Sequence, residues 1–128
     1  MILSSDSLKP IYVQIAEWLE SEILSGSIGL DEKVWSQYQL AQMFNINPAT
    51  AAKGLNILAD EDILYKKRGL GMFVASDAQE RIRTRRRQQT LRQLALDLVQ
   101  EAMRLGLSNE ELTDLVTNIR REIEEGLE

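Results

Sequence analysis

The sequence has 128 residues, of which 44% are hydrophobic and 27% charged, and its formal net charge is −5. This length fits one domain, or one small domain with an appendage, and the apolar fraction is sufficient for a buried core. Because the chain contains neither cysteine nor histidine, disulfides, zinc sites of the Cys/His kind and triads built on either residue are excluded. We expect no enzyme, no catalytic residue, no metal site and no cofactor.

The N-terminal segment, MILSSDSLKP, has no basic region followed by a long apolar stretch, and no run of about 18 apolar residues occurs anywhere. We therefore expect no signal peptide, no membrane association and a cytoplasmic protein. The charges are unevenly distributed. Six arginines and no acid lie between Arg81 and Arg92, Lys66, Lys67 and Arg68 form a second basic run, and Asp60, Glu61 and Asp62 form an acidic one.

The first predicted helix runs from about Pro10 to Ser25, because four apolar residues recur there every four positions: Ile11, Ile15, Leu19 and Ile23. Proline suits the first helical position, where its missing N–H is harmless. Gly26 is expected to end the helix, since glycine readily adopts the left-handed conformation that commonly follows one.

Two short helices follow, separated by a tight turn. The segment Ser36-Gln37-Tyr38-Gln39 has the form of a capping box and predicts a helix that stops at Asn45. The next helix begins with Asn47 as its cap and Pro48 at its first position, and ends around residues 60–62. This spacing is typical of a helix-turn-helix motif.

Residues 63–75 predict a β-hairpin, because two β-rich runs flank the turn sequence Arg68-Gly69-Leu70-Gly71. A helix, a helix-turn-helix and a hairpin follow one another in the order of a winged helix. The predicted fold class is therefore mainly α with a small β-hairpin wing. We place a winged helix-turn-helix domain at residues 1–76 and a helical dimerisation hairpin at residues 77–128.

Two helices make up the predicted C-terminal hairpin. The first runs from Asp77 to about Leu105 and ends at Gly106, and the second begins at a capping box on Ser108. Each helix has one apolar stripe, which buries little by itself and is best covered by the same hairpin of a second chain. The expected dimer interface consists of Leu91, Leu94, Leu98, Leu112, Leu115, Ile119 and Ile123.

The segments PIYVQIAEWLESEILSGSI, SQYQLAQMFNINPATAAKGLNILADEDIL and RGLGMFV resemble the N-terminal domain of GntR-type bacterial transcription regulators. The short C-terminal part resembles the YtrA subfamily. The resemblance implies a homodimer that binds double-stranded DNA at a palindromic operator and represses a nearby operon, often one encoding an ABC transporter. The chain departs from the family pattern at Leu30-Asp31, at Val34-Trp35 and at Tyr38, where the family usually has arginine.

Three groups of residues are expected to contact DNA. The N-terminus of a helix presents unpaired amides and a partial positive charge, which favour phosphate and base acceptors. Short side chains at the third predicted helix allow close approach to a major groove, and the hairpin turn can reach a minor groove. The expected DNA-binding residues are Ser36, Gln37, Tyr38, Asn47, Pro48, Ala49, Thr50, Lys53, Lys67, Arg68, Gly69 and Gly71.

Several alternatives stay open. The arginines of residues 81–92 either form a solvated face, pair with acids such as Glu122, or contact flanking phosphates. The acids of residues 60–62 are interpreted as a solvated helix end. A small-molecule effector has room near Trp18 or Trp35, although nothing selects that place. The net negative charge and Tyr38 favour a second hypothesis, a winged-helix adaptor that binds protein without specific DNA binding.

Overall fold

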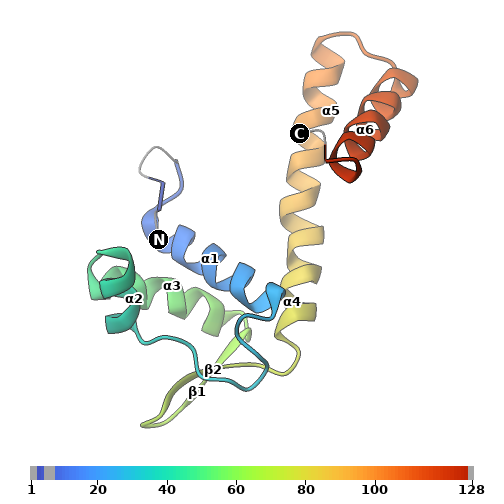
Figure 1. Ribbon diagram of the computed structural model, residues 1–128. Helices are drawn as coiled ribbons and strands as arrows, with labels where there is room; N and C mark the ends of the chain where they lie inside the picture. Colours follow the sequence, from blue (N-terminus) through green and yellow to red (C-terminus); the bar gives the residue numbers. More distant parts are fainter. Residues whose placement is uncertain (1–2, 5–7, 127–128) are drawn as a thin grey trace. The chain divides into compact units, whose positions relative to one another are not determined.

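The computed structural model describes residues 3–4 and 8–126, and the chain forms two compact units, Met1–Arg85 and Arg86–Glu128 (Figure 1). Within the described residues, the first unit contains four α-helices and a two-stranded sheet, and the second unit is helical. This composition confirms the predicted mainly α fold with a small hairpin wing.

Helix α1, Ile11–Ser25, begins after Pro10 and ends at Gly26, whose φ of 83° is left-handed. The four-residue repeat faces the interior as predicted, because Ile15, Leu19 and Ile23 are completely buried. These side chains form the centre of the hydrophobic core of the first unit.

Helix α2, Gln37–Phe44, starts with the predicted capping box. The Gln39 amide donates to Oγ of Ser36 over 3.1 Å, and the Ser36 amide donates to Oε1 of Gln39 over 2.8 Å. The helix ends at Asn45, which adopts the left-handed conformation with φ 55°. Helix α3, Pro48–Asp60, follows directly after its cap, Asn47, so the helix-turn-helix prediction is confirmed.

The packing of α3 against α1 depends on Gly54. A Cβ atom at this position would lie 2.9 Å from the carbonyl oxygen of Tyr12 and 2.9 Å from Cγ2 of Ile15. Such distances are shorter than van der Waals contact, so only glycine lets the α3 backbone approach α1 this closely.

Strands β1, Leu64–Lys67, and β2, Gly71–Val74, form the predicted antiparallel hairpin, with Leu64 opposite Val74. A third segment, residues 31–34, runs along the other edge of β2 and was not predicted. Its backbone is held by hydrogen bonds from Asp31 N to Val74 O (2.8 Å), from Val74 N to Glu32 O (3.0 Å) and from Val34 N to Met72 O (3.0 Å). These bonds tie the segment that precedes α2 to the hairpin.

Helix α4, Ala78–Arg85, belongs to the first unit, because Ala78 and Ile82 are completely buried in its core. The compact unit therefore extends to Arg85. The division into functional domains at residue 76 stays a prediction.

The second unit consists of η1, Arg86–Leu91, α5, Arg92–Arg104, and α6, Asn109–Glu124. The predicted helix from Asp77 to about Leu105 is helical from Ala78 to Arg104, but it is divided into α4, η1 and α5, because η1 has π-helical hydrogen bonding. No apolar residue stands between Ile82 and Leu91, so no buried stripe holds the α-helical register there. A π-helical segment is rare and widens the helix locally.

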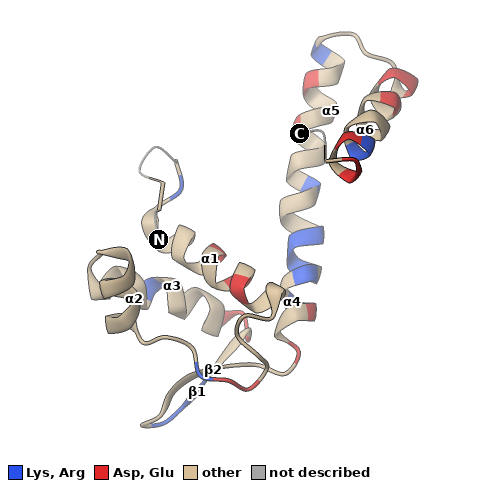
Figure 2. Cartoon of the chain, in the orientation of Figure 1, with Lys and Arg blue, Asp and Glu red and all other residues tan. Residues whose placement is uncertain are grey.

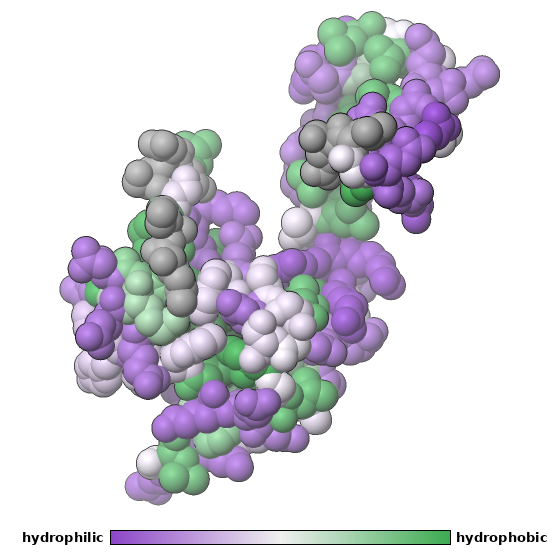
Figure 3. All heavy atoms as spheres, viewed as in Figure 1, coloured by the Kyte–Doolittle hydropathy of each residue, from purple (hydrophilic) through white to green (hydrophobic). Residues whose placement is uncertain are grey.

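Much apolar surface of the second unit is exposed. Leu94 is 61% exposed, Met103 73% and Ile123 55%, whereas Ala102 is buried. On the face drawn in Figure 3, hydrophobic and hydrophilic residues both reach the surface of this unit. None of the helices in the described ranges combines the length and the apolarity that a membrane span requires.

Candidate nucleic-acid interface

The start of α3 is organised by Asn47, whose Oδ1 accepts a hydrogen bond from the Ala49 amide over 2.8 Å. The side-chain oxygen therefore accepts the capping hydrogen bond, and the NH₂ group of Asn47 is available to donate to an acceptor on a ligand. Pro48 takes the first helical position, where an amide would lack an intrahelical partner. The helix end is thus preorganised, with a partial positive charge at its tip.

One strip of α3 faces outward. Ala49, Lys53 and Asn56 are exposed, and Ala52, between them on the same side, is half-buried. The opposite strip, which includes Ala51, Gly54 and Leu55, is buried. The small residues at the tip leave room for another molecule close to the backbone, and Asn56 extends the polar strip by one turn beyond the predicted contacts.

Lys53 is held beside α1. Its Nζ atom lies 4.7 Å from the centre of the Tyr12 ring, within the range of a cation–π interaction. The ammonium group of Lys53 therefore has a defined place near the tip of α3, although the side chain is exposed.

A groove of about 610 Å³ lies between the start of α2, the middle of α3 and the hairpin. It brings together seven of the twelve predicted DNA-binding residues: Ser36, Gln37, Tyr38, Lys67, Arg68, Gly69 and Gly71. The other five, Asn47 to Thr50 and Lys53, lie outside its lining, along the first turns of α3. The predicted residues thus form two groups on one unit, a groove and a helix tip.

The groove is cationic. Lys33, Lys66, Lys67 and Arg68 contribute to its lining, and no acidic residue of the described chain does. Figure 2 shows basic residues on the hairpin and on α3, and acidic residues on α1. The net negative charge of the whole chain therefore does not describe this surface, and phosphate groups would be attracted to it.

The hairpin that carries these cations is rigidified at its base. Tyr65 and Phe73 stack with ring centres 5.8 Å apart, and Nζ of Lys67 lies 4.6 Å from the centre of the Phe73 ring. The Tyr65 hydroxyl donates to Oδ1 of Asp31 over 2.9 Å, and this hydrogen bond raises the pKa of Tyr65. Leu70 at the turn is 60% exposed.

Sequence reasoning missed nine residues of the groove lining, among them Lys33, Asn56, Lys66 and Leu70. Lys66 belongs to a basic run visible in the sequence, and Asn56 lies on the same helical face as Ala49 and Lys53. Lys33 carries no such signal, because it reaches the groove only through the pairing of residues 31–34 with β2.

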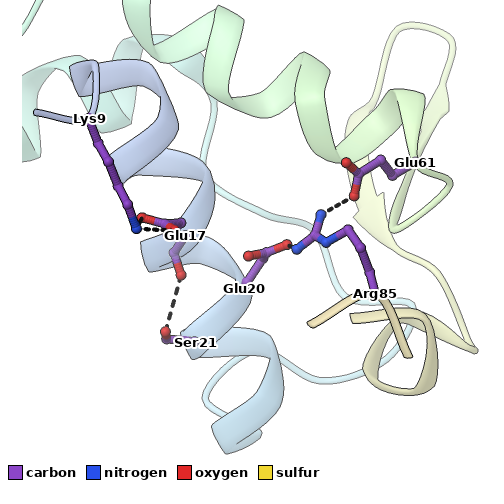
Figure 4. Close-up of polar contacts among 6 residues, drawn as sticks. All are labelled: Lys9, Glu17, Glu20, Ser21, Glu61 and Arg85. Atoms are coloured by element: carbon purple, nitrogen blue, oxygen red, sulfur yellow. Dashed lines mark hydrogen bonds and ion pairs between the residues drawn. The ribbon is translucent and has the colours of Figure 1, made fainter. Parts of the chain in front are cut away.

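Arg85 has a structural role that the sequence did not indicate. It forms ion pairs with Glu20 of α1 and with Glu61 at the end of α3 (Figure 4). Glu20 is only 3% exposed, so its carboxylate is buried where it meets the Arg85 guanidinium. Glu61 is exposed at the end of α3, as expected of a solvated helix end, and in addition pairs with Arg85.

The two tryptophans pack within the protein. Trp18 lies 5.1 Å from Trp35 and 5.0 Å from Phe44, measured between ring centres, the second pair meeting edge to face. Within the described ranges, no group of three or more acidic side chains is arranged to hold a metal ion.

A capped helix tip beside a cationic groove, carried on a helix-turn-helix with a hairpin wing, defines the class of winged-helix regulatory proteins. Residues 11–74 match the family described as "Bacterial regulatory proteins, gntR family". The chain belongs to this family, as the resemblance implied. The family consists of transcription regulators rather than enzymes, so the expectation that the chain is no enzyme is confirmed.

Two relatives from Bacillus subtilis illustrate different extents of similarity. The HTH-type transcriptional repressor NagR is 34% identical over 80 residues, which cover 62% of this chain and 33% of NagR. The chain thus spans about a third of the length of this relative. The HTH-type transcriptional repressor YtrA is 27% identical over 120 residues, which cover 94% of this chain and 92% of YtrA.

Solved structures support the fold. A GntR family transcriptional regulator from Listeria monocytogenes is 29% identical, with a TM-score of 0.73 over 88% of this chain and 97% of that one. AraR(DBD) in complex with operator ORX1 is 32% identical, with a TM-score of 0.54 over 59% of this chain and 95% of that one. The first unit is therefore the winged-helix domain of a DNA-binding transcription regulator.

Proposed function

We propose that the protein is a homodimeric, sequence-specific repressor that binds a palindromic operator in double-stranded DNA and acts in the cytoplasm. The observation that carries this proposal is the position of the α3 tip beside a groove lined by four cations and no acid. The names of NagR and YtrA, both transcriptional repressors, support repression rather than activation.

The α3 tip is assigned to base contacts in the major groove. Thr50 and the free NH₂ of Asn47 can hydrogen-bond base edges, and Ala49 can contact a thymine methyl group. Ser36, Gln37 and Tyr38 at the start of α2 are assigned to the DNA backbone, together with Lys53. The hairpin residues Lys67 to Gly71 are assigned to phosphates and the adjoining minor groove.

A gel-shift titration with the upstream region of the chain's own gene tests this assignment. The intact protein is expected to prefer a palindromic duplex over a scrambled duplex of the same composition, with an affinity that falls steeply with salt. Thr50→Ala should reduce that preference, whereas Lys53→Gln and Arg68→Gln should weaken binding to both duplexes equally. If the two duplexes bind equally well to the intact protein, the DNA-binding proposal fails and the protein-adaptor hypothesis is favoured.

The apolar stripes of α5 and α6 are assigned to the dimer interface. Leu91, Leu94, Leu115, Ile119 and Ile123 are all at least 41% exposed, a large amount for leucine and isoleucine in one short segment. Dimer formation would place the two α3 tips in successive major grooves, about 34 Å apart. Sedimentation at micromolar concentration should show a dimer that Leu94→Asp converts to monomer, and a monomeric wild type would refute the assignment.

The regulated operon is proposed to encode an ABC transporter, on the strength of the similarity to YtrA over nearly the whole chain. Deletion of the gene should raise the transcript of such an operon beside it, as measured by reverse transcription and quantitative PCR. An unchanged transcript would remove this part of the proposal while leaving DNA binding intact.

A further inference from the structure

Lys33 lies on a segment that is fixed to the hairpin. Residues 31–34 pair with β2 through three backbone hydrogen bonds of 2.8–3.0 Å, and Lys33 stands opposite Phe73. The backbone of Lys33 therefore moves with the hairpin, although the residue lies just before α2 in the sequence.

The Lys33 side chain crosses the hairpin at Gly71. A Cβ atom on Gly71 would lie 2.9 Å from Cε of Lys33 and 3.6 Å from its Nζ. Gly71 also has a φ of 108°, which side-chain-bearing residues rarely adopt. The backbone conformation thus favours glycine here, and the absence of a Cβ atom leaves the space in which the end of the Lys33 side chain lies.

Neither acidic neighbour of Lys33 in the sequence forms an ion pair with it. Oε1 of Glu32 accepts a hydrogen bond from the Gly29 amide over 3.0 Å, and Oδ1 of Asp31 accepts one from the Tyr65 hydroxyl over 2.9 Å. Lys33 forms no ion pair with any described residue, and it lines the same groove as Lys66, Lys67 and Arg68.

We infer that Lys33 is a phosphate-binding residue of the DNA interface, positioned by the space that Gly71 leaves. This inference rests on the proposed function, since it assigns a further contact to the same surface. A lysine binds phosphate as a point charge without reading base identity. Lys33 therefore contributes affinity and salt dependence, and not sequence preference.

The test compares Lys33→Gln and Lys33→Arg with the intact protein on the palindromic and scrambled duplexes over a series of salt concentrations. Lys33→Gln should weaken binding to both duplexes by the same factor and reduce the slope of log K against log salt by about one. Lys33→Arg should retain the slope. Arg104→Gln, which makes the same change in net charge in the second unit, should leave both quantities unchanged.

The outcomes separate the two proposals. If the intact protein prefers the palindrome but Lys33→Gln binds like Arg104→Gln, the assignment of Lys33 is wrong and the proposed function stands. If Lys33→Gln reduces the preference for the palindrome, Lys33 reads bases and the phosphate assignment is also wrong. An intact protein that shows no preference overturns the proposed function and the inference together.

A thermal double-mutant cycle tests the seating of Lys33 on Gly71. Gly71→Ala introduces backbone strain in any background, but the steric conflict exists only when a long side chain occupies position 33. The drop in melting temperature caused by Gly71→Ala should therefore be smaller in Lys33→Ala than in the intact protein. Equal drops in the two backgrounds would show that the lysine side chain is not held over Gly71, and its positioning by Gly71 would then be wrong.

Discussion

The two units of the chain differ in how far their apolar side chains are buried. In the first unit, Ile15, Leu19 and Leu58 are fully buried within one chain, whereas in the second Leu94 and Ile123 are more than half exposed. Helix propensity and capping are good in both, since Ser36 and Ser108 start their helices with complete capping boxes. Regular helices alone therefore do not make a closed domain.

The difference has an energetic consequence. Burial of a leucine side chain stabilises a fold by about 1.5–3 kcal/mol, and the first unit gains this from its own chain. In a single chain, the exposed leucines of the second unit do not contribute this burial free energy. The stability of the second unit is therefore expected to depend on a partner. Both tryptophans, Trp18 and Trp35, lie in the first unit, and their fluorescence can report that unit separately.

The largest expected effect comes from removing Arg85. Arg85→Met removes the ion pair between Arg85 and the buried Glu20 carboxylate, and breaking a buried pair costs about 3–5 kcal/mol. Urea unfolding followed by tryptophan fluorescence measures the loss in the first unit. Arg81→Met is the matched control on the same helix, because its ion pair with Asp77 is exposed and such pairs contribute only about 0.2–1 kcal/mol. Equal losses would show that Glu20 does not depend on Arg85.

The ion pair of Arg85 and Glu20 also shows which contacts a sequence pattern can predict and which it cannot. The capping box of Ser36 and Gln39 joins residues three positions apart, and the core stripe of α1 repeats every four, so local pattern was sufficient to predict both. Arg85 meets Glu20 and Glu61 across 65 and 24 positions of sequence. No local periodicity encodes such a contact.

The residues of the proposed DNA interface also divide into those that a local sequence pattern predicts and those that only the tertiary fold brings together. The α3 tip was predictable because Asn47 and Pro48 form a local helix start. Lys33 was not, because only the pairing of residues 31–34 with β2 brings it to the groove. The π-helical turn η1 was likewise missed, since the residues after Ile82 contain no apolar stripe that predicts one register over another.

A matched pair of leucines tests the contrast between the units directly. Leu19→Ala should destabilise the first unit by about 2–5 kcal/mol at any protein concentration, because it opens a cavity in a closed core. Leu98 is 39% exposed, so Leu98→Ala should act mainly through association, with an effect that changes with protein concentration. Far-ultraviolet circular dichroism at two concentrations measures it. A large loss from Leu98→Ala that does not depend on concentration would mean that the second unit is closed by itself.

Gly54 provides a smaller effect whose sign is informative. Alanine favours a helix over glycine by about 1 kcal/mol, but the added Cβ would lie 2.9 Å from the Tyr12 carbonyl oxygen, a backbone atom that cannot rotate away. Overpacking costs about 1–3 kcal/mol, so Gly54→Ala should destabilise the first unit. Asn56→Ala on the exposed face of α3 gains propensity without a clash and should stabilise it slightly. Tryptophan-monitored urea unfolding compares the two, and stabilisation by Gly54→Ala would contradict the close packing of α1 and α3.

The smallest effect concerns the start of α6, which relies on its cap rather than on a core. Oε1 of Glu111 accepts a hydrogen bond from the Ser108 amide over 3.0 Å, and this bond lowers the pKa of Glu111 from its ordinary value of 4.5. A lowered folded-state pKa means that the charged form stabilises the helix above pH 4.5 and that this contribution is lost as the pH falls through the folded value.

Glu111→Gln keeps a side-chain oxygen for the Ser108 amide but removes the charge, which also interacts favourably with the N-terminus of the helix. The intact protein should therefore melt at a higher temperature than Glu111→Gln at pH 7, and the difference should shrink as the pH is lowered below 4.5. Circular dichroism at 222 nm follows both melts. A difference that persists in acid would assign the stabilisation to the shape of the side chain rather than to its charge, and α6 would then begin on hydrogen-bond geometry alone.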